Sequence, residues 1–408
     1  MVNKKEALKI ISALKNDARF VGGCVRDLLL KKDIKDIDIA TAFTPQEATK
    51  LLKSKGIKVI PTGIKHGTVT AIINDSKFEI TTLRKDVETY GRHAKVEFTD
   101  DWKEDAKRRD FTINALYMDK NGKIYDYFGG QKDLKNEIVR FIGNPEDRVK
   151  EDYLRILRFF RFSSFYAKNI DKNSLSACIK HSGKLKTLSG ERIRVEMFKI
   201  LTSPKAHNVL SVMEEKGILK ILIPGKVNLK LFKELKELIN ENKNLKHCDS
   251  DYVLYLAGIL FFSLLEDEKI ELISKLWKLS NRERDKLHAL AILPSEIFGK
   301  FDLPEQKKLL RKKGKEDFTC VVLLKWAEEL SAANSKKSAI DKKYQNIIKL
   351  IKDWKAPEFP VSGKDLINSG IEPGKEFGLL LKKAEKWWEG KGYKPNKKEI
   401  IKYIMKSI

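Results

Sequence analysis

The residues best suited to chemistry stand near the start of the chain. Gly22, Gly23 and Arg26 precede two carboxylates, Asp36 and Asp38, which a single apolar residue separates. Side chains alternate between the two faces of a strand, so both carboxylates should point the same way. Such a pair favours a hard cation such as Mg²⁺, and glycines let backbone amides approach phosphates closely. The pattern predicts metal-dependent chemistry on a nucleotide.

Taken alone, this pattern also has a simpler interpretation. An Asp-x-Asp pair at an exposed strand end is usually solvated, and Gly-Gly is usually a turn. The alternation that aligns the carboxylates places Ile37 and Ile39 on the opposite face, toward a core. The choice between the two interpretations depends on the clusters further along the chain.

A second polar cluster contains the adjacent arginines Arg108 and Arg109, followed by Asp110 and Asn114. Guanidinium groups are rigid forks of donors that match triphosphate oxygens. Asp110 and Asn114 lie one helical turn apart, so together they could hold a ribose hydroxyl and a base or phosphate oxygen. The alternative is a surface helix with local salt bridges.

The third cluster lies in a stretch, 151–166, that has helical apolar spacing. Asp152 and Arg155 are three residues apart and would share a helix face. Asp152 would accept from the exocyclic amine of C or A, and Arg155 would donate to the adjacent ring nitrogen or carbonyl. G and U present the opposite pattern and would be rejected. The alternative is an i,i+3 salt bridge over an apolar face.

Two further arginines, Arg158 and Arg161, continue this stripe. Each three-residue step drifts by about 60° around an α-helix, so a straight helix cannot aim all four side chains at one point.

The elements that must position these clusters change in character along the chain. Within the first 140 residues, 5–14 and 46–55 are predicted helices, the second with Thr44 as N-cap and Pro45 at its first position. Predicted strands cover 58–60, 68–73 and 78–83, with a hairpin turn at Asn74-Asp75. The charged segment 84–105 is predicted to be a mobile loop. From Pro145 onward the predicted helices are 151–166, 191–202, 208–219, 251–265, 283–293 and 306–313.

Composition favours a polyanionic partner. The chain has 408 residues, too many for one hydrophobic core, and 82 Lys plus Arg against 57 Asp plus Glu give a net charge of +25. The alternative is a lysine-rich background without function, since Lys is spread along the whole chain.

The cysteines and apolar runs indicate an intracellular protein. The four cysteines are scattered, without a Cys-x-x-Cys pair, as in reduced proteins. The longest apolar run, 252–265, is too short to span a bilayer, and the first residues show neither a signal core nor a presequence. We therefore expect a cytoplasmic protein rather than one of the mitochondrial matrix.

Together, and in this order, the three clusters resemble the motifs of the bacterial and mitochondrial (class II) tRNA nucleotidyltransferases, the CCA-adding enzymes and their poly(A) polymerase relatives. The matching residues are Gly22-Gly23-x-Val25-Arg26-Asp27 with Asp36-x-Asp38, Arg108-Arg109-Asp110-Phe-Thr-x-Asn114, and Glu151-Asp152-x-x-Arg155. A later segment, 191–196, is similar to the family's neck motif. The resemblance is dense over 18–200 and returns near 363–378.

The resemblance implies an α+β nucleotidyltransferase head, a small mixed or antiparallel sheet with helices, followed by an all-α neck, body and tail. The expected boundaries are 1–140 for the head, 141–215 for the neck, 216–352 for the body and 353–408 for the tail. The neck would recognise the base, and the body and tail would bind tRNA.

The implied activity is template-independent addition of C, C and A to tRNA 3′ ends from CTP and ATP, with release of pyrophosphate. Asp36 and Asp38 would be the catalytic residues and would bind Mg²⁺. The implied partners are the 3′ end and acceptor region of tRNA, with no membrane and no obligate protein partner. The residues that would bind the nucleotide are Gly23, Arg26 and Arg109 as contacts, Asp110 on the ribose, Asp152 and Arg155 as the template for C and A, and Arg158 and Arg161 on the triphosphate or beside the base.

The segment 83–102 bears on which member of the family this is. It resembles the loop of full CCA-adding enzymes of the alphaproteobacterial and mitochondrial type, although Tyr90 stands where that type usually has Asp before Gly91-Arg92-His93. Its presence implies that A addition is retained. An A-adding or poly(A) enzyme of the family and an inactive RNA-binding module are the alternatives.

Three further side chains each have two interpretations. Glu79 could be a third carboxylate beside the aspartates or could make a strand-end salt bridge. Trp387-Trp388 could stack on RNA, but a packed core is the favoured interpretation.

Overall fold

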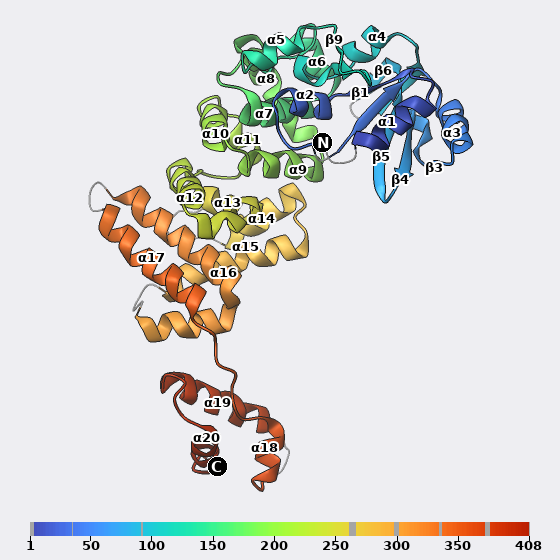
Figure 1. The fold of residues 1–408 in the computed structure, drawn as a ribbon. Helices are drawn as coiled ribbons and strands as arrows, with labels where there is room; N and C mark the ends of the chain where they lie inside the picture. Colours follow the sequence, from blue (N-terminus) through green and yellow to red (C-terminus); the bar gives the residue numbers. More distant parts are fainter. Residues whose placement is uncertain are drawn as a thin grey trace. The chain divides into compact units, whose positions relative to one another are not determined.

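The computed structural model describes residues 4–34, 36–90, 93–260, 267–297, 302–333, 337–371 and 376–407. Its contacts divide the chain into two compact units, Met1–Gly225 and Lys226–Ile408 (Figure 1). The first unit contains both β-strands and helices, whereas the described part of the second unit contains helices only. The predicted α+β head followed by a helical region is confirmed. The finer division into head, neck, body and tail stays a prediction.

The first unit contains a seven-stranded sheet with the strand order β3-β4-β5-β2-β1-β8-β9. All neighbouring strands are antiparallel except β2 and β5, which are parallel. The strands are β1 Ala18–Val21, β2 Asp38–Thr41, β3 Lys58–Gly63, β4 Thr68–Ile73, β5 Ser76–Thr82, β8 Leu116–Met118 and β9 Ile124–Asp126.

The local sequence explains two of these elements. Asn74 and Asp75 have φ values of 47° and 62°, the left-handed conformation that a two-residue hairpin turn between β4 and β5 requires. Helix α3, Pro45–Ser54, begins with Thr44 as N-cap, and the Thr44 hydroxyl accepts the Glu47 amide in a capping box. The predicted hairpin and helix start are confirmed.

The segment predicted to be a mobile loop instead forms secondary structure. β6 Arg84–Tyr90 and β7 His93–Phe98 pair in a separate two-stranded sheet, and α4 Trp102–Lys107 follows. The prediction was wrong because it relied on apolar alternation, whereas a ribbon outside the main sheet is held by backbone pairing. Gly91 and Arg92 lie outside the described residues, as does the side chain of His93.

The remaining helices of the first unit pack on and beyond the sheet (Figure 1). They are α1 Lys4–Ala13, α2 Gly23–Leu29, α5 Gly130–Lys135, α6 Pro145–Glu151, α7 Leu154–Tyr166, α8 Lys172–His181, α9 Gly190–Leu201, α10 Ala206–Glu215 and α11 Leu219–Leu222, with a short 3-10 turn, η2, at Thr112–Asn114.

The predicted helix 151–166 is in fact two helices. Asp152 ends α6 with an extended backbone, φ −154° and ψ 110°, and α7 begins at Leu154. The Leu154 amide donates to Asp152 Oδ1 at 3.1 Å. Asp competes with helix hydrogen bonding by accepting nearby backbone amides, so it favours such a break. Asp152 and Arg155 therefore do not share the face of one helix.

The second unit consists of helices, and none in the described part of the chain is long and apolar enough to cross a membrane. They are α12 Leu229–Glu241, α13 Tyr252–Leu260, α14 Asp267–Trp277, α15 Asn281–Ile297, α16 Leu303–Ala332, α17 Lys337–Asp353, α18 Gly363–Asn368, α19 Phe377–Gly390 and α20 Lys397–Met405. Gly314, with φ 81° and ψ 168°, kinks α16 one residue after the predicted helix 306–313.

The tryptophan pair belongs to a small core formed by α18, α19 and α20. Trp388 is 2% exposed among Leu366, Ile400 and Ile404. Trp387 stacks on Tyr403, with ring centroids 4.3 Å apart. The favoured interpretation, a packed core, is confirmed for Trp388.

Candidate active site

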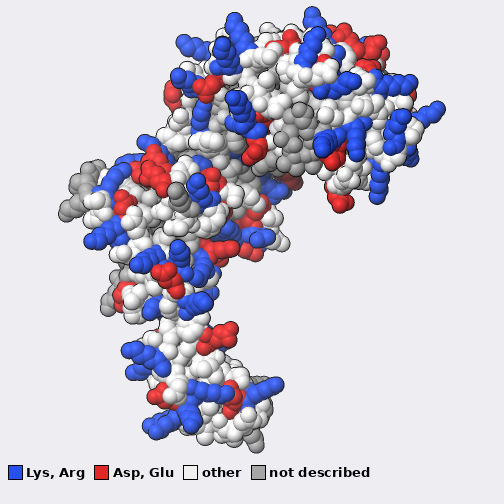
Figure 2. All heavy atoms as spheres, in the orientation of Figure 1, with Lys and Arg blue, Asp and Glu red and all other residues white. Residues whose placement is uncertain are grey.

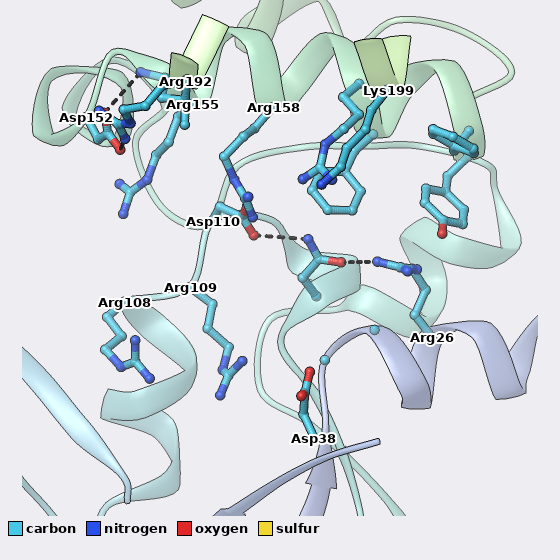
Figure 3. A pocket seen from close by; sticks show the side chains of 18 residues that line it. Arg26, Asp38, Arg108, Arg109, Asp110, Asp152, Arg155, Arg158, Arg192 and Lys199 are labelled. Carbon is cyan, nitrogen blue, oxygen red and sulfur yellow. Dashed lines mark hydrogen bonds and ion pairs between the residues drawn. The ribbon is translucent and has the colours of Figure 1, made fainter. Parts of the chain in front are cut away.

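A cavity of about 790 Å³ in the first unit gathers residues that lie far apart in the sequence (Figure 3). Nine of the ten predicted site residues line it: Gly23, Arg26, Asp38, Arg109, Asp110, Asp152, Arg155, Arg158 and Arg161. The tenth, Asp36, lines a neighbouring cavity of about 540 Å³ that also includes Asp38. In Figure 3, Arg155 and Arg158 extend from the helices on one side, with Asp38 and Arg109 on the other.

The two carboxylates occupy the start of the central strand β2. Asp38 is its first residue, and Asp36 is exposed just before it, while Ile37 and Ile39 are 7% and 0% exposed. The predicted alternation, with both isoleucines in the core, is therefore present. Gly22, before helix α2, has φ 73°, a conformation that favours glycine.

Negative charge predominates among the groups that act on Asp38. Its Cα pairs with that of Glu79 on the parallel strand β5. Burial, followed by the negative charges of Glu79 and Asp36, raises the pKa of Asp38, and Arg109 only partly opposes this. Among the described residues, no group of three or more Asp, Glu, His or Cys side chains is placed to hold a metal ion, and the role of Glu79 stays a prediction.

A buried carboxylate that the sequence did not reveal as functional holds the arginine pair. Asp105 is 1% exposed, and its Oδ1 lies 2.8 Å from Arg108 Nη2 while its Oδ2 lies 3.0 Å from Arg109 Nη2. The Tyr117 hydroxyl also donates to Oδ2, at 2.7 Å. Although burial opposes it, the charge of Arg109 and then of Arg108 holds the pKa of Asp105 at about 2. The spacing of Asp105 three and four residues before the arginines was the available signal.

Asp110 accepts hydrogen bonds both from nearby residues of its own segment and from helix α7. It is 9% exposed, and its Oδ2 accepts from Arg158 Nε at 2.8 Å and from Nη2 at 2.5 Å. Its Oδ1 accepts from Asn114 Nδ2 at 3.0 Å and from the Phe111 amide at 2.9 Å. Burial opposes ionisation, but Arg158 and Asn114 nevertheless lower the pKa of Asp110. The carboxylate is therefore ionised at neutral pH.

Asp152 and Arg155 both reach the cavity, but each has a different partner. Asp152 Oδ2 lies 2.6 Å from Nη2 of Arg192 on helix α9. Arg155 Nη1 bonds to the Glu151 carboxylate and, at 2.9 Å, to the Arg148 carbonyl. The alternative of an ion pair between Asp152 and Arg155 is thus wrong, because the chain turns between α6 and α7.

Arg161 lies one turn further along α7 than Arg158. Its Nε is 2.7 Å from Oε2 of Glu196 on α9, and its guanidinium lies over the Phe162 ring at 4.3 Å. Burial lowers the pKa of Arg161, an effect that the Glu196 charge opposes. Eight basic side chains and only three carboxylates line the cavity, a balance that suits a polyanion such as a triphosphate.

Family models match most of the chain. The poly A polymerase head domain matches residues 18–140, the probable RNA and SrmB-binding site of polymerase A matches 169–228, and the putative tRNA nucleotidyltransferase domain 2 matches 254–404. The mitochondrial CCA tRNA nucleotidyltransferase 1 of Mus musculus is 35% identical over 98% of this chain and 90% of its own length. The chain belongs to the class II CCA-adding tRNA nucleotidyltransferases of the poly(A) polymerase family. Enzymes of this polymerase family typically depend on a metal ion.

Bacterial members of the CCA-adding family are similar over nearly the same span. The CCA-adding enzyme of Streptococcus gordonii is 34% identical over 97% of this chain and 96% of its own length. The Bacillus stearothermophilus CCA-adding enzyme in complex with CTP has a TM-score of 0.71 and 28% identity, and covers 100% of this chain and 98% of that one. The Thermotoga maritima CCA-adding enzyme complexed with tRNA(CCA), with a TM-score of 0.66 and 22% identity over 100% and 96% of the two chains, supports the fold alone.

Several residues of this CCA-adding enzyme line the cavity without having been predicted to do so. Phe165 and Tyr166 come from the end of α7, and Arg192 and Lys199 come from α9. Arg192 was noted only as part of a neck segment. The aromatic residues read as core positions of an amphipathic helix, so their sequence pattern did not distinguish them.

Proposed function

We propose that the chain adds C, C and A to the 3′ end of tRNA, using CTP and ATP and releasing pyrophosphate, in the cavity of the first unit. Membership of the CCA-adding family supports the reaction. The observation that carries the assignment to this cavity is its lining, because Asp38 of β2, the Asp105-bound arginines and the arginines of α7 all reach it.

Asp36 and Asp38 would hold Mg²⁺ in this proposal. Their donor set fits, because Mg²⁺ is usually bound by one or two carboxylates together with substrate phosphates and water. The negative charges of Glu79 and Asp36, which add to the effect of burial in raising the pKa of Asp38, support the fit, since a divalent cation would balance them. When held by Asp36 and Asp38, Mg²⁺ would supply Lewis-acid activation of the tRNA 3′-hydroxyl and neutralisation of charge on the phosphates.

The basic side chains would bind and orient the triphosphate. Arg109 is fixed by Asp105 and would contact the incoming nucleotide together with Gly23 and Arg26. Arg158 and Arg161 would hold the triphosphate or flank the base from the α7 side, while Asp110 would accept a ribose hydroxyl. Guanidinium groups held by buried carboxylates lose little entropy on binding, which favours a productive geometry.

Asp152 and Arg155 would select the base. Each is oriented by its own partner, Arg192 for Asp152 and Glu151 for Arg155. The contacts of Arg155 among the described residues run through Nη1, so Nη2 remains to donate to a ring nitrogen or carbonyl. Asp152 would accept the exocyclic amine that C and A share.

The net charge of +25 supports binding of tRNA, in which the predicted body, 216–352, and tail, 353–408, would take part. Figure 2 shows Lys and Arg side chains spread over the face in view. A cytoplasmic location is supported by the four cysteines, which are all buried free thiols, as in a reducing compartment.

The deciding experiment offers the purified protein a tRNA that lacks CCA, with CTP alone, ATP alone or both. We expect two C additions with CTP, and a terminal A only when ATP is also present. Extension with ATP alone would overturn the proposal in favour of an A-adding or poly(A) enzyme. Loss of extension in Asp36→Ala, with unchanged tRNA binding, would rule out an inactive RNA-binding module.

A further inference from the structure

The side-chain amide of Asn114 bridges Arg26 and Asp110. Arg26 Nη1 donates to Asn114 Oδ1 at 2.5 Å, and Asn114 Nδ2 donates to Asp110 Oδ1 at 3.0 Å. Figure 3 draws these two hydrogen bonds as the dashed lines between the labelled Asp110 and Arg26. Arg26 and Asn114 are 7% and 8% exposed, so water competes little with either bond. The bridge connects helix α2 to the turn η2.

Only one orientation of this amide satisfies both neighbours. Arg26 can only donate, and ionised Asp110 can only accept. The oxygen of Asn114 must therefore face Arg26, and its NH₂ group must face Asp110. Both ends of the amide are thus used within the protein, which argues against the hypothesis that Asn114 itself binds the nucleotide.

Arg26 is itself held firmly from the other side. Its Nε and Nη2 donate to the two oxygens of Asp27 at 2.9 and 3.0 Å. The guanidinium also lies over the Tyr166 ring at 4.3 Å, and the Tyr166 hydroxyl donates to Asp27 at 3.1 Å. A guanidinium fixed in this way gives Asn114 a rigid support.

The two oxygens of Asp110 differ in how they are held. Oδ1 receives the Asn114 amide and the Phe111 backbone amide, both of which belong to the head. Oδ2 receives Arg158, which comes from α7 and is 33% exposed in its side chain. Arg158 lines the cavity and is the most accessible of the three donors, so the bonds to Oδ2 are the ones that a ligand in the cavity could displace.

We propose that Asn114 is a positioning residue for ribose recognition, which holds Asp110 Oδ1 and so aims Oδ2 at a ribose hydroxyl. Arg26 acts on the ribose through Asn114, in addition to any contact with phosphate. This inference rests on the proposed role of Asp110. Without the Asn114 donor, only the Phe111 amide restrains Oδ1, so the carboxylate is less firmly oriented and the contact with the ribose hydroxyl weakens.

The test measures addition of one nucleotide to tRNA lacking CCA, with CTP, 2′-deoxyCTP and 3′-deoxyCTP. The readout is the ratio of kcat/KM for CTP to that for each deoxy analogue. Asp110→Asn first identifies which ratio reports the Asp110 contact. Asn114→Ala should then lower the same ratio by about tenfold, the value of one well-placed hydrogen bond, by reducing kcat/KM for CTP much more than for the deoxy analogue.

Two further variants separate positioning from folding. Asn114→Asp keeps the size and the acceptor for Arg26 but removes the donor to Asp110, so it should lower the ratio as Asn114→Ala does. Thr112→Val is the matched control on the same turn, since the Thr112 hydroxyl donates to Asp133 Oδ2 at 2.6 Å and Thr112 is 3% exposed. Thr112→Val should lower the melting temperature without changing the ratio.

The outcomes distinguish the ribose-binding role of Asp110 from the positioning role of Asn114. If Asp110→Asn changes neither ratio, the ribose role of Asp110 fails and the inference fails with it. If Asp110→Asn lowers a ratio but the Asn114 variants do not, only the positioning role is overturned. An equal fall in kcat/KM for CTP and for the deoxy analogues in the Asn114 variants would likewise overturn it, because a purely structural role does not discriminate between sugars.

Discussion

Asp152, in the break between α6 and α7, forms an ion pair with Arg192 of α9, with Oδ2 and Nη2 2.6 Å apart. The ion pair connects Asp152, which we propose selects the base, with the segment 191–196, which resembles the family's neck motif. The side chains are 17% and 20% exposed, so both stay in reach of the cavity while water only partly screens them.

Arg192→Ala should therefore impair nucleotide use more than folding. Asp152 would lose a charge-assisted hydrogen bond, and we expect kcat/KM for CTP and ATP to fall about tenfold. Single-nucleotide incorporation kinetics test this. Arg192→Lys, which keeps the charge, should recover part of the loss, and unchanged kinetics in both variants would contradict an orienting role.

Arg155→Ala should relax base choice while leaving tRNA affinity nearly unchanged. The lost donor should cost roughly 1 to 3 kcal/mol of discrimination against GTP and UTP. Misincorporation assays with each nucleotide measure it. Lys150→Ala is the control, because Lys150 is a half-exposed cation on α6 that pairs with Glu146. If Arg155→Ala keeps wild-type selectivity, the templating role is wrong.

Asp38→Asn and removal of divalent metal by a chelator should have the same effect. We expect nucleotide addition to fall by more than about a hundredfold, because the proposed metal site is lost in both cases. Restored Mg²⁺ should recover the chelated enzyme but not the variant. Asp75→Asn, in the exposed hairpin turn, serves as the control for charge removal, and full activity in chelator would refute metal dependence.

Asp105 should make stability depend on pH in the acidic range. Its pKa in the folded protein is about 2, below the usual unfolded value of about 3.9, so the ionised form stabilises the fold. This contribution of roughly 2 to 3 kcal/mol is fully present above pH 4 and is lost as the pH falls toward 2. Urea unfolding of the wild type and Asp105→Asn should differ at pH 7 and converge at low pH. A difference that does not depend on pH would contradict this prediction.

Binding of tRNA should weaken steeply with salt. If basic side chains of the second unit contact phosphates, affinity should fall by at least about tenfold between 50 and 200 mM salt through counterion release. Filter binding or fluorescence anisotropy measures it. A flat response would assign the net charge to lysine-rich composition.

Local signals in the sequence were sufficient for several elements. Thr44-Pro45 marked the start of α3, and Asn74-Asp75 marked the β4–β5 hairpin, because capping and turn geometry depend on neighbouring residues only. Alternation around Asp38 marked the buried isoleucines and, on the opposite face, the two carboxylates. The β6–β7 ribbon was missed because backbone pairing leaves no apolar period.

The same distinction between local sequence signals and the folded structure applies to the site. The sequence by itself determined which residue types are present, since Asp36-x-Asp38, Arg108-Arg109-Asp110 and Asp152-x-x-Arg155 are contiguous motifs. Asp105 holds both arginines at a helical spacing that the sequence contained, whereas tertiary structure alone decided that Asn114 joins Arg26 to Asp110 and that Arg192 rather than Arg155 pairs with Asp152. Two of these three arrangements link segments 40 or more positions apart, because one extended residue at Asp152 redirects the chain and the fold brings distant side chains into hydrogen-bonding distance.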